Sequence, residues 1–339
     1  MAKTARELFA DSIVVDMTAP GSPLQGPVTP TVADTDRWIE HYESGGVTWA
    51  SFTAAADFTG GVEPTLRNIT LARRFFLSQP DRFILIERAD DVLRAKREKK
   101  LAVSLHFQGT VPIGTDLGLV EIYKRLGVVH MLMAYNNRNH VADGCHERTD
   151  AGLSKFGLSL VQEMNRVGVL VDVTHTGYRS AMDAIEASTA PVIMSHSNPN
   201  ALYAHDRNVP DDQIVAMAKT GGVMGIHGVG IFLSASGTDV SADILARNID
   251  YTVQLVGPAH VGLGLDYIEN LPVLLALVRA TGDAIWSKSG GYHNQDQKFA
   301  SPRVIEGVAD VLLRQGYPEA DVRGILGENW LRVVREVWG

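Results

Sequence analysis

Hydrophobic positions along the chain gather in short continuous runs rich in β-branched residues, and amphipathic stretches separate these runs. An apolar run without alternation is typical of a strand that is covered on both faces, as in a parallel sheet. Nine such runs occur, at residues 12–17, 47–55, 82–88, 101–109, 128–136, 167–175, 190–197, 221–229 and 260–267. One of the stretches between them, residues 153–168, has apolar positions every three or four residues and ends at Gly168, which predicts a helix.

This alternation predicts an α/β fold, and specifically a closed (β/α)8 TIM barrel. Eight or nine β–α units within about 270 residues fit a barrel better than an open doubly wound sheet. No GxGxxG motif follows the first run, which argues against a dinucleotide-binding fold. We therefore expect one barrel domain over residues 1–339.

Two further segments complete the predicted barrel. Residues 268–302 are polar and rich in glycine and aromatic residues, so we expect a long loop, or a lid, on the active face. The C-terminal "ILGENWLRVVREVWG" has the pattern of an amphipathic helix that packs back on the barrel.

Composition narrows the class of protein. Hydrophobic residues make up 45% of the 339, which is ample for a core, and the net charge of −8 shows no electrostatic footprint for nucleic acid. No apolar run approaches the length of a membrane span, and the charged N-terminus has no secretory h-region. The single cysteine, Cys145, excludes an intramolecular disulfide. We expect a cytoplasmic protein that binds neither nucleic acid nor membrane.

Candidate chemistry lies where the predicted strands end, because the active site of an α/β barrel forms at the carboxyl ends of its strands. The last polar residues of the runs are Asp16, Gln108, Tyr135 with Asn136, His175, His196, His227 and Asp266. Any one of them can instead serve the backbone of a loop. Their convergence on one mouth favours a functional site.

His175 and His196 are the best candidates for metal ligands. They lie one β–α unit apart, so they come from adjacent strands about 4.8 Å apart. Two imidazoles at that spacing can close on one ion. Asp266 is either a third ligand or the general base for a metal-activated water, and a helix N-cap is its structural alternative.

Other polar residues of the mouth have two interpretations each. Arg207 can hold a substrate carboxylate in a bidentate fork, or pair with the acids that open the next helix. Asn136 orients substrate or holds a turn, and His227 is best interpreted as a hydrogen-bonded histidine facing the same mouth. His106 points the same way as Gln108 but one layer deeper, which favours a buried neutral core histidine over a ligand.

Several segments together resemble the membrane (renal) dipeptidase family of the amidohydrolase superfamily. The similarity runs from about residue 10 to the C-terminus and is strongest in "FGLSLVQEMNRVGVLVDVTH", "PVIMSHSNPNALYAHDRNVPDD", "GGVMGIHG" and "HVGLGLD". The resemblance implies a TIM barrel with a dinuclear zinc site that hydrolyses dipeptides, including some with D-residues. It also implies that His175 and His196 hold the second zinc. By the same resemblance, Asp266 binds the first zinc and handles the proton of the water, and Arg207 receives the substrate carboxylate.

The first metal site of that family does not carry over. Where the family has Asp-Gly-His-x-Asp, this chain has Asp16 followed by Thr18 and Pro20. The bridging glutamate is replaced by Gln108, whose neutral amide cannot offset the repulsion between two cations. Tyr135 stands in place of a histidine on the substrate side, where its hydroxyl can donate to an oxyanion.

We therefore expect a dipeptidase-like hydrolase that uses one divalent metal ion, zinc, to cleave an amide in a small carboxylate-bearing substrate. The expected residues are His175, His196 and Gln108 for the metal, Asp266 and Tyr135 for catalysis, and Arg207, Asn136 and His227 for the substrate. A metal-free binding protein on a retired scaffold and a lyase on the same barrel are the alternatives. A homodimer is the default assembly.

Overall fold

The computed structural model describes residues 3–20 and 32–338, and its strands form a nearly closed parallel barrel. Eight strands follow one another around it: β1 (Val15–Ala19), β2 (Trp49–Ala56), β4 (Leu101–Gln108), β5 (Val128–Leu132), β6 (Leu170–Asp172), β7 (Val192–Ser197), β8 (Met224–Ile226) and β9 (Val261–Leu263). The chain segments at β1 and β9 meet at the seam, where the Asp266 N–H donates to the Thr18 carbonyl over 3.0 Å. The predicted TIM barrel is confirmed.

The strand β3 (Phe83–Leu85) lies outside this ring. It pairs with the first residues of β4, beginning with Phe83 beside Leu101, whereas β5 pairs with the later ones, beginning with Val128 beside Leu105. β3 and β5 thus share one edge of β4. The hydrophobic run at 82–88 does contain a strand, but that strand is an addition to the barrel.

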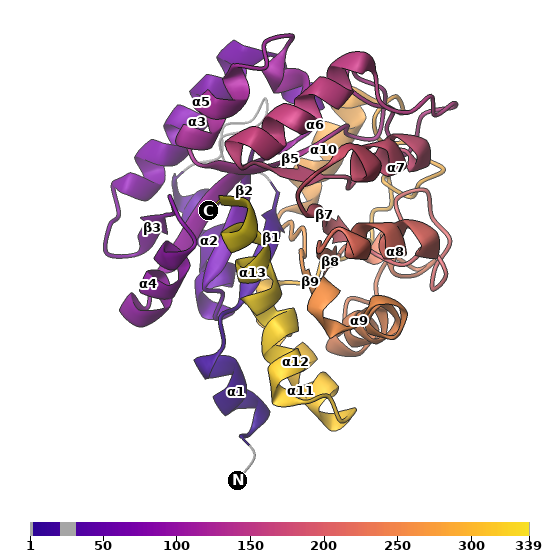
Figure 1. The fold of residues 1–339 in the computed structure, drawn as a ribbon. Helices are drawn as coiled ribbons and strands as arrows, with labels where there is room; N and C mark the ends of the chain where they lie inside the picture. The colour runs from indigo at the N-terminus through magenta and orange to yellow at the C-terminus, as the bar shows by residue number, and fades with distance from the viewer. Residues whose placement is uncertain (1–2, 21–31, 339) are drawn as a thin grey trace.

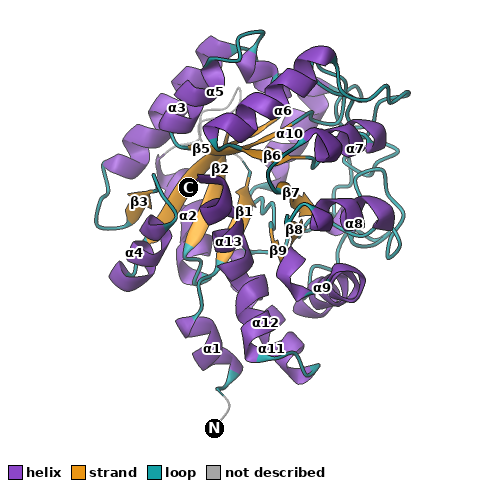
Figure 2. Cartoon of the chain, in the orientation of Figure 1, coloured by secondary structure: helices purple, strands orange, loops and turns teal. Residues whose placement is uncertain are grey.

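Helices surround the barrel on its outside (Figures 1 and 2). They are α1 (Ala5–Asp11), α2 (Val32–Ser44), α3 (Val62–Leu77), α4 (Asp90–Glu98), α5 (Leu119–Arg125), α6 (Lys155–Val167), α7 (Tyr178–Ala187), α8 (Asp211–Lys219), α9 (Ala242–Val256), α10 (Leu271–Thr281), α11 (Ile305–Arg314), α12 (Glu319–Arg323) and α13 (Asn329–Trp338). The ends of α6 follow from local chemistry. The Ser154 hydroxyl accepts the Gly157 N–H at its start, and Gly168 takes a left-handed conformation with φ 80° at its end.

The prediction of one long loop over residues 268–302 is wrong in its first half. Residues Leu271–Thr281 form α10, which begins where the Asn270 side chain accepts the Val273 N–H and buries Leu275 and Val278. An N-cap and an apolar face at helical spacing are sufficient to form this helix. After α10, residues 282–300 form turns without a helix, and Trp286 and Tyr292 from this part pack against Phe232 and other apolar side chains near the barrel mouth. We call residues 282–300 the capping segment.

The C-terminal helix α13 packs back on the barrel, as expected. It covers the end of the barrel where the strands begin. Trp330 is fully buried and donates its indole N–H to the Leu263 carbonyl over 3.2 Å. Trp338 lies edge-on to Trp49, with ring centroids 6.2 Å apart. In Figure 1 this helix crosses the front of the ring of strands. Because α13 covers the amino ends of the strands, the carboxyl ends form the open face of the barrel, where active sites of this fold lie.

No helix in the described part of the chain is both long enough and apolar enough to pass through a lipid bilayer.

Candidate active site

The polar residues predicted at the strand ends do come together at the carboxyl end of the barrel, and three of them have unusual backbone geometry. Asn136, His175 and Asp266 have φ values of 57°, 63° and 56°, and the described residues include only one other non-glycine residue with positive φ. Such conformations cost about 1–3 kcal/mol each and collect at functional sites. The strained backbone thus occurs at three residues whose side chains lie at the carboxyl end of the barrel.

His175 and His196 face each other, as their places after β6 and near the end of the neighbouring strand β7 predict. Their Nε2 atoms lie 3.1 Å apart, and both rings are buried. The other nitrogen of His175, Nδ1, lies 2.6 Å from Oδ1 of Asn136. The Asn136 amide nitrogen donates to the Ile285 carbonyl, so its oxygen faces the ring as an acceptor. Nδ1 of His175 therefore carries the hydrogen, and Nε2 presents a lone pair.

The hydroxyls of Ser195 and Thr18 surround the other nitrogen of His196. Nδ1 of this ring lies 2.8 Å from Ser195 Oγ and 3.0 Å from Thr18 Oγ1. His196 and both hydroxyl residues are fully buried. The ring is thus fixed from one side, with its Nε2 directed into the mouth.

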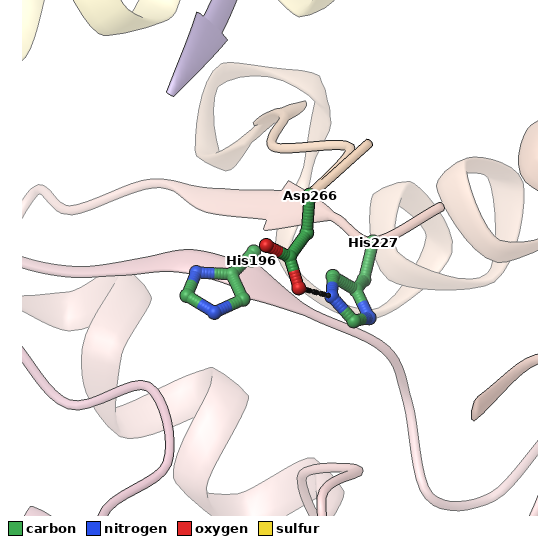
Figure 3. A group of neighbouring side chains, drawn as sticks. All are labelled: His196, His227 and Asp266. Atoms are coloured by element: carbon green, nitrogen blue, oxygen red, sulfur yellow. Dashed lines mark hydrogen bonds and ion pairs between the residues drawn. The ribbon is translucent and has the colours of Figure 1, made fainter. Parts of the chain in front are cut away.

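His227 and Asp266 form a second pair beside His196. His227 Nε2 lies 3.0 Å from Asp266 Oδ2, and the Asp266 carboxylate lies between the two imidazoles (Figure 3). One potential ligand atom from each of His196, His227 and Asp266 falls within 4.8 Å of the others. The prediction that His227 is a hydrogen-bonded histidine at this mouth agrees with these contacts.

Burial keeps the imidazoles of this cluster neutral. Desolvation lowers the pKa of His175 and of His196 well below the ordinary value, and the nearby Arg207 guanidinium lowers both further. Burial also lowers the pKa of His227, although Asp266 opposes that shift. Neutral imidazole is the form that ligates metals.

These donors fit a divalent metal ion. Imidazole and carboxylate are ligand types that zinc accepts in proteins, and His196, His227 and Asp266 form one group of possible ligands. His175 joins this group through His196, and their two Nε2 atoms, 3.1 Å apart, suit neighbouring positions on one ion. Positions 18, 20 and 108, where the family resemblance implies further metal ligands, provide few donor atoms for an ion in this chain. Thr18 is engaged with His196, Pro20 has no donor side chain, and the Gln108 amide donates to Thr53 Oγ1 over 3.0 Å.

Arg207 reaches the same cluster from the loop after β7. It is only 3% exposed, and one of its terminal nitrogens donates to the His196 carbonyl over 2.9 Å. Among the described residues, its Nε has no hydrogen-bond partner, and it makes no ion pair with Asp211 or Asp212 at the start of α8. Arg207 and His175 both line a cavity of about 430 Å³, together with Cys145 and His205. The guanidinium is therefore directed at the site.

Tyr135 is held on both sides. Its ring stacks on His175, and its hydroxyl accepts the indole N–H of Trp286 over 3.0 Å. The hydroxyl hydrogen of Tyr135 thus remains available for donation. Burial raises the pKa of this phenol, so it stays protonated.

Sequence reasoning missed the capping segment's contacts and one acid. Trp286 holds Tyr135, and Tyr292 places its hydroxyl 2.8 Å from His146 Nε2. Asp57 accepts the N–H groups of Tyr135 and Val111, each over 3.0 Å, and so ties two active-face loops together. The aromatic residues of the 268–302 segment and an acid directly after the second strand were the available signals.

His106 is the core histidine that its layer predicts. It is fully buried, and its two nitrogens lie 3.1 Å from Ser51 Oγ and 2.9 Å from Thr53 Oγ1. Its ring stacks on His130, with centroids 4.5 Å apart. All its hydrogen-bonding capacity is used inside the barrel, which leaves no nitrogen for an ion at the mouth.

Comparison with known proteins places the chain in a family. Residues 28–278 match the model of the membrane dipeptidase family, peptidase family M19. An uncharacterized dipeptidase, C965.12, of Schizosaccharomyces pombe is 34% identical over 61% of this chain and 51% of its own length. The dipeptidase tcpJ of Claviceps purpurea is 27% identical over 97% of this chain and 73% of its own. The chain thus spans about half of the first of these proteins.

Solved structures agree with the fold. An amidohydrolase from Pseudomonas aeruginosa superposes with a TM-score of 0.87 at 31% identity, covering 99% of this chain and 100% of that one. A metallo peptidase from Rhodobacter sphaeroides, liganded with a phosphinate mimic of the dipeptide L-Ala-D-Ala, has a TM-score of 0.78 at 18% identity, covering 97% and 100%. With the barrel, the strand-end cluster and the family match in agreement, the chain belongs to the membrane dipeptidase family, peptidase family M19.

Proposed function

We propose that this protein is a metal-dependent hydrolase that cleaves the amide bond of a dipeptide or a similar small carboxylate-bearing substrate, with one bound zinc ion. The observation that supports the proposal is the buried pair of neutral imidazoles, His175 and His196, with Nε2 atoms 3.1 Å apart. His196 also belongs to the group of possible ligands that it forms with His227 and Asp266. His175, His196 and Asp266 would hold the ion, and Gln108 is the further candidate ligand. A bound ion would supply Lewis acidity toward the scissile carbonyl.

The chain's own residues supply the remaining roles. Asp266 would take the proton of the attacking water, and His227, 3.0 Å from its carboxylate, would orient it. The Tyr135 hydroxyl, whose oxygen already accepts from Trp286, has its hydrogen free for the oxygen that gains charge during the attack.

Substrate recognition centres on Arg207. Its buried guanidinium has an unpartnered Nε among the described residues, which suits a bidentate contact with a substrate carboxylate. His175 and Arg207 line the same cavity, so the carboxylate and the scissile bond of a small substrate can occupy neighbouring positions. Asn136 and His227 complete the substrate side. The phosphinate dipeptide mimic bound to the Rhodobacter sphaeroides metallo peptidase supports a substrate of this size.

Metal analysis with a substrate panel tests the proposal. Protein purified without chelators should contain about one equivalent of zinc, hydrolyse some members of a panel of L,L- and L,D-dipeptides, and lose that activity on chelation. His175→Ala should lose both the metal and the activity. Less than about 0.2 equivalents of metal, with activity indifferent to chelators, would contradict the proposal.

A second candidate function is small-molecule binding without catalysis. It is favoured by the loss of ligand types at positions 18, 20 and 108, and by the fact that 3.1 Å also suits a hydrogen bond between the two imidazoles. It predicts saturable binding of a carboxylate ligand with no turnover of any panel member. For either function we propose a cytoplasmic location and a homodimer, which fractionation and light scattering would test.

A further inference from the structure

Thr18 is the starting point, because it stands where the family has a metal-binding histidine. Its side chain is fully buried at the seam of the barrel. Thr18 Oγ1 lies 3.0 Å from His196 Nδ1, and its carbonyl accepts the Asp266 N–H over 3.0 Å. A residue at a lost ligand position thus contacts two of the residues that would hold the remaining ion.

The two facing histidines are held by different kinds of partner. Asn136 offers its carbonyl oxygen to His175, and a carbonyl oxygen only accepts, so the hydrogen of that ring is fixed on Nδ1. His196 instead meets the hydroxyls of Ser195 and Thr18. A hydroxyl rotates and can either donate or accept, so it can serve both tautomers of the ring.

The facing Nε2 atoms make this difference important. Without an ion, two bare nitrogens 3.1 Å apart would repel, so His196 must carry its hydrogen on Nε2 and donate it to His175. A hydroxyl of Thr18 or Ser195 then donates to His196 Nδ1. With an ion between the rings, both Nε2 atoms must be bare, and His196 carries its hydrogen on Nδ1 and donates to the hydroxyls. The ring is neutral in both states, so no net proton is taken up or released.

We propose that Thr18 and Ser195 form a pair of rotating hydroxyls that positions His196 and lets its neutral ring change tautomer when a metal ion binds. Both are positioning residues that act through His196. This inference rests on the proposed metal-dependent function and deepens it: the position of a lost first-metal ligand now supports a ligand of the remaining ion. Hydrogen-bond partners of metal ligands typically account for about 10- to 100-fold in metal affinity.

Zinc titration of variants, with a chromophoric chelator as competitor, tests the inference. Thr18→Val keeps the shape and removes the hydroxyl, Thr18→Ser restores the hydroxyl, and Ser195→Ala removes the second one. We expect Thr18→Val combined with Ser195→Ala to weaken zinc binding at least about 10-fold, with Thr18→Ser close to wild type. The matched control is Ser51→Ala, which removes a buried hydroxyl from His106 and His130 and should leave zinc affinity unchanged.

Nitrogen-15 NMR of the imidazoles provides a readout that activity does not. In metal-free wild type, His196 should show its hydrogen on Nε2, and zinc should move it to Nδ1, while His175 keeps Nδ1–H throughout. Equal zinc affinity in the double variant, or an unchanged His196 tautomer on zinc binding, would overturn this inference alone. A wild type that binds no zinc would overturn the metal assignment and this inference together.

Discussion

The ring of Tyr135 stacks on the ring of His175, with centroids 4.1 Å apart and planes inclined by 26°. His175 is therefore fixed by this stack on one face and by Asn136 at Nδ1. Tyr135 stands where the family has a histidine on the substrate side. Tyr135 keeps a flat ring over His175, the proposed metal ligand, and offers a hydroxyl where the family has a ring nitrogen. The packing role and the chemical role of this position can therefore be separated by mutation.

Tyr135→Phe should lower kcat by about 100-fold or more and leave zinc content unchanged, because the stack remains and only the hydroxyl donor is lost. Steady-state kinetics on the best dipeptide of the panel, with metal analysis of the same preparation, would measure both. Tyr135→Leu removes the stack as well, and should also weaken zinc binding. A Phe variant with wild-type kcat would assign Tyr135 to packing alone.

His196→Ala should abolish zinc binding and activity together, since His196 lies next to both His175 and Asp266. Zinc content after dialysis and a single-turnover assay would show this. The control is His140→Ala, because His140 is an exposed histidine outside the cluster and its removal should change neither quantity. Retention of one tightly bound equivalent in His196→Ala would move the ion to other residues.

Arg207→Lys should raise KM for a carboxylate-bearing substrate by 10-fold or more with a smaller effect on kcat, because a point charge cannot form the bidentate contact. A substrate analogue with an amide in place of the carboxylate should bind equally poorly to both forms. If KM for the carboxylate substrate did not change, Arg207 would serve only to hold the His196 carbonyl.

Sequence patterns predicted the barrel and the convergence of polar residues at its carboxyl end, because both depend on local periodicity. His175 follows β6 and His196 lies near the end of β7, one unit later, and parallel pairing of these two strands brings such residues together. Tertiary packing decided the features that the patterns did not predict. The run at 82–88 became a strand outside the ring because β5 already occupies the rest of that edge of β4.

The long-range contacts of the site were also beyond local patterns. Trp286 and Tyr135 are 151 positions apart, so no local sequence pattern could predict their hydrogen bond. Thr18 and His196 are 178 positions apart and meet only because the barrel curves back toward its first strand. The family resemblance shows only that Thr18 stands where a metal-binding histidine is expected. Its contact with His196 became visible only in the folded structure.

Asp16 should make the free energy of unfolding depend on pH. Burial raises the pKa of this carboxyl from 3.8 to about 7, although the Leu265 and Thr18 N–H groups oppose the shift. Below about pH 4 the group is protonated in both the folded and the unfolded state and contributes nothing. As pH rises from 4 to 7, only the unfolded state ionises, so stability falls, by about 4 kcal/mol in total, and it is constant above pH 7.

Asp16→Asn removes this ionisation and keeps an oxygen that can accept the same N–H groups. Its buried amide nitrogen costs free energy because Oδ2 of Asp16 has no partner among the described residues, but this cost is the same at every pH, so the informative quantity is a difference between two pH values. From pH 5 to pH 8, the variant should gain about 3 kcal/mol in unfolding free energy relative to wild type. Urea denaturation of both proteins at the two pH values measures this directly. Contributions that are common to both proteins cancel in this comparison, and a constant difference between variant and wild type would show that Asp16 is ionised in the folded protein.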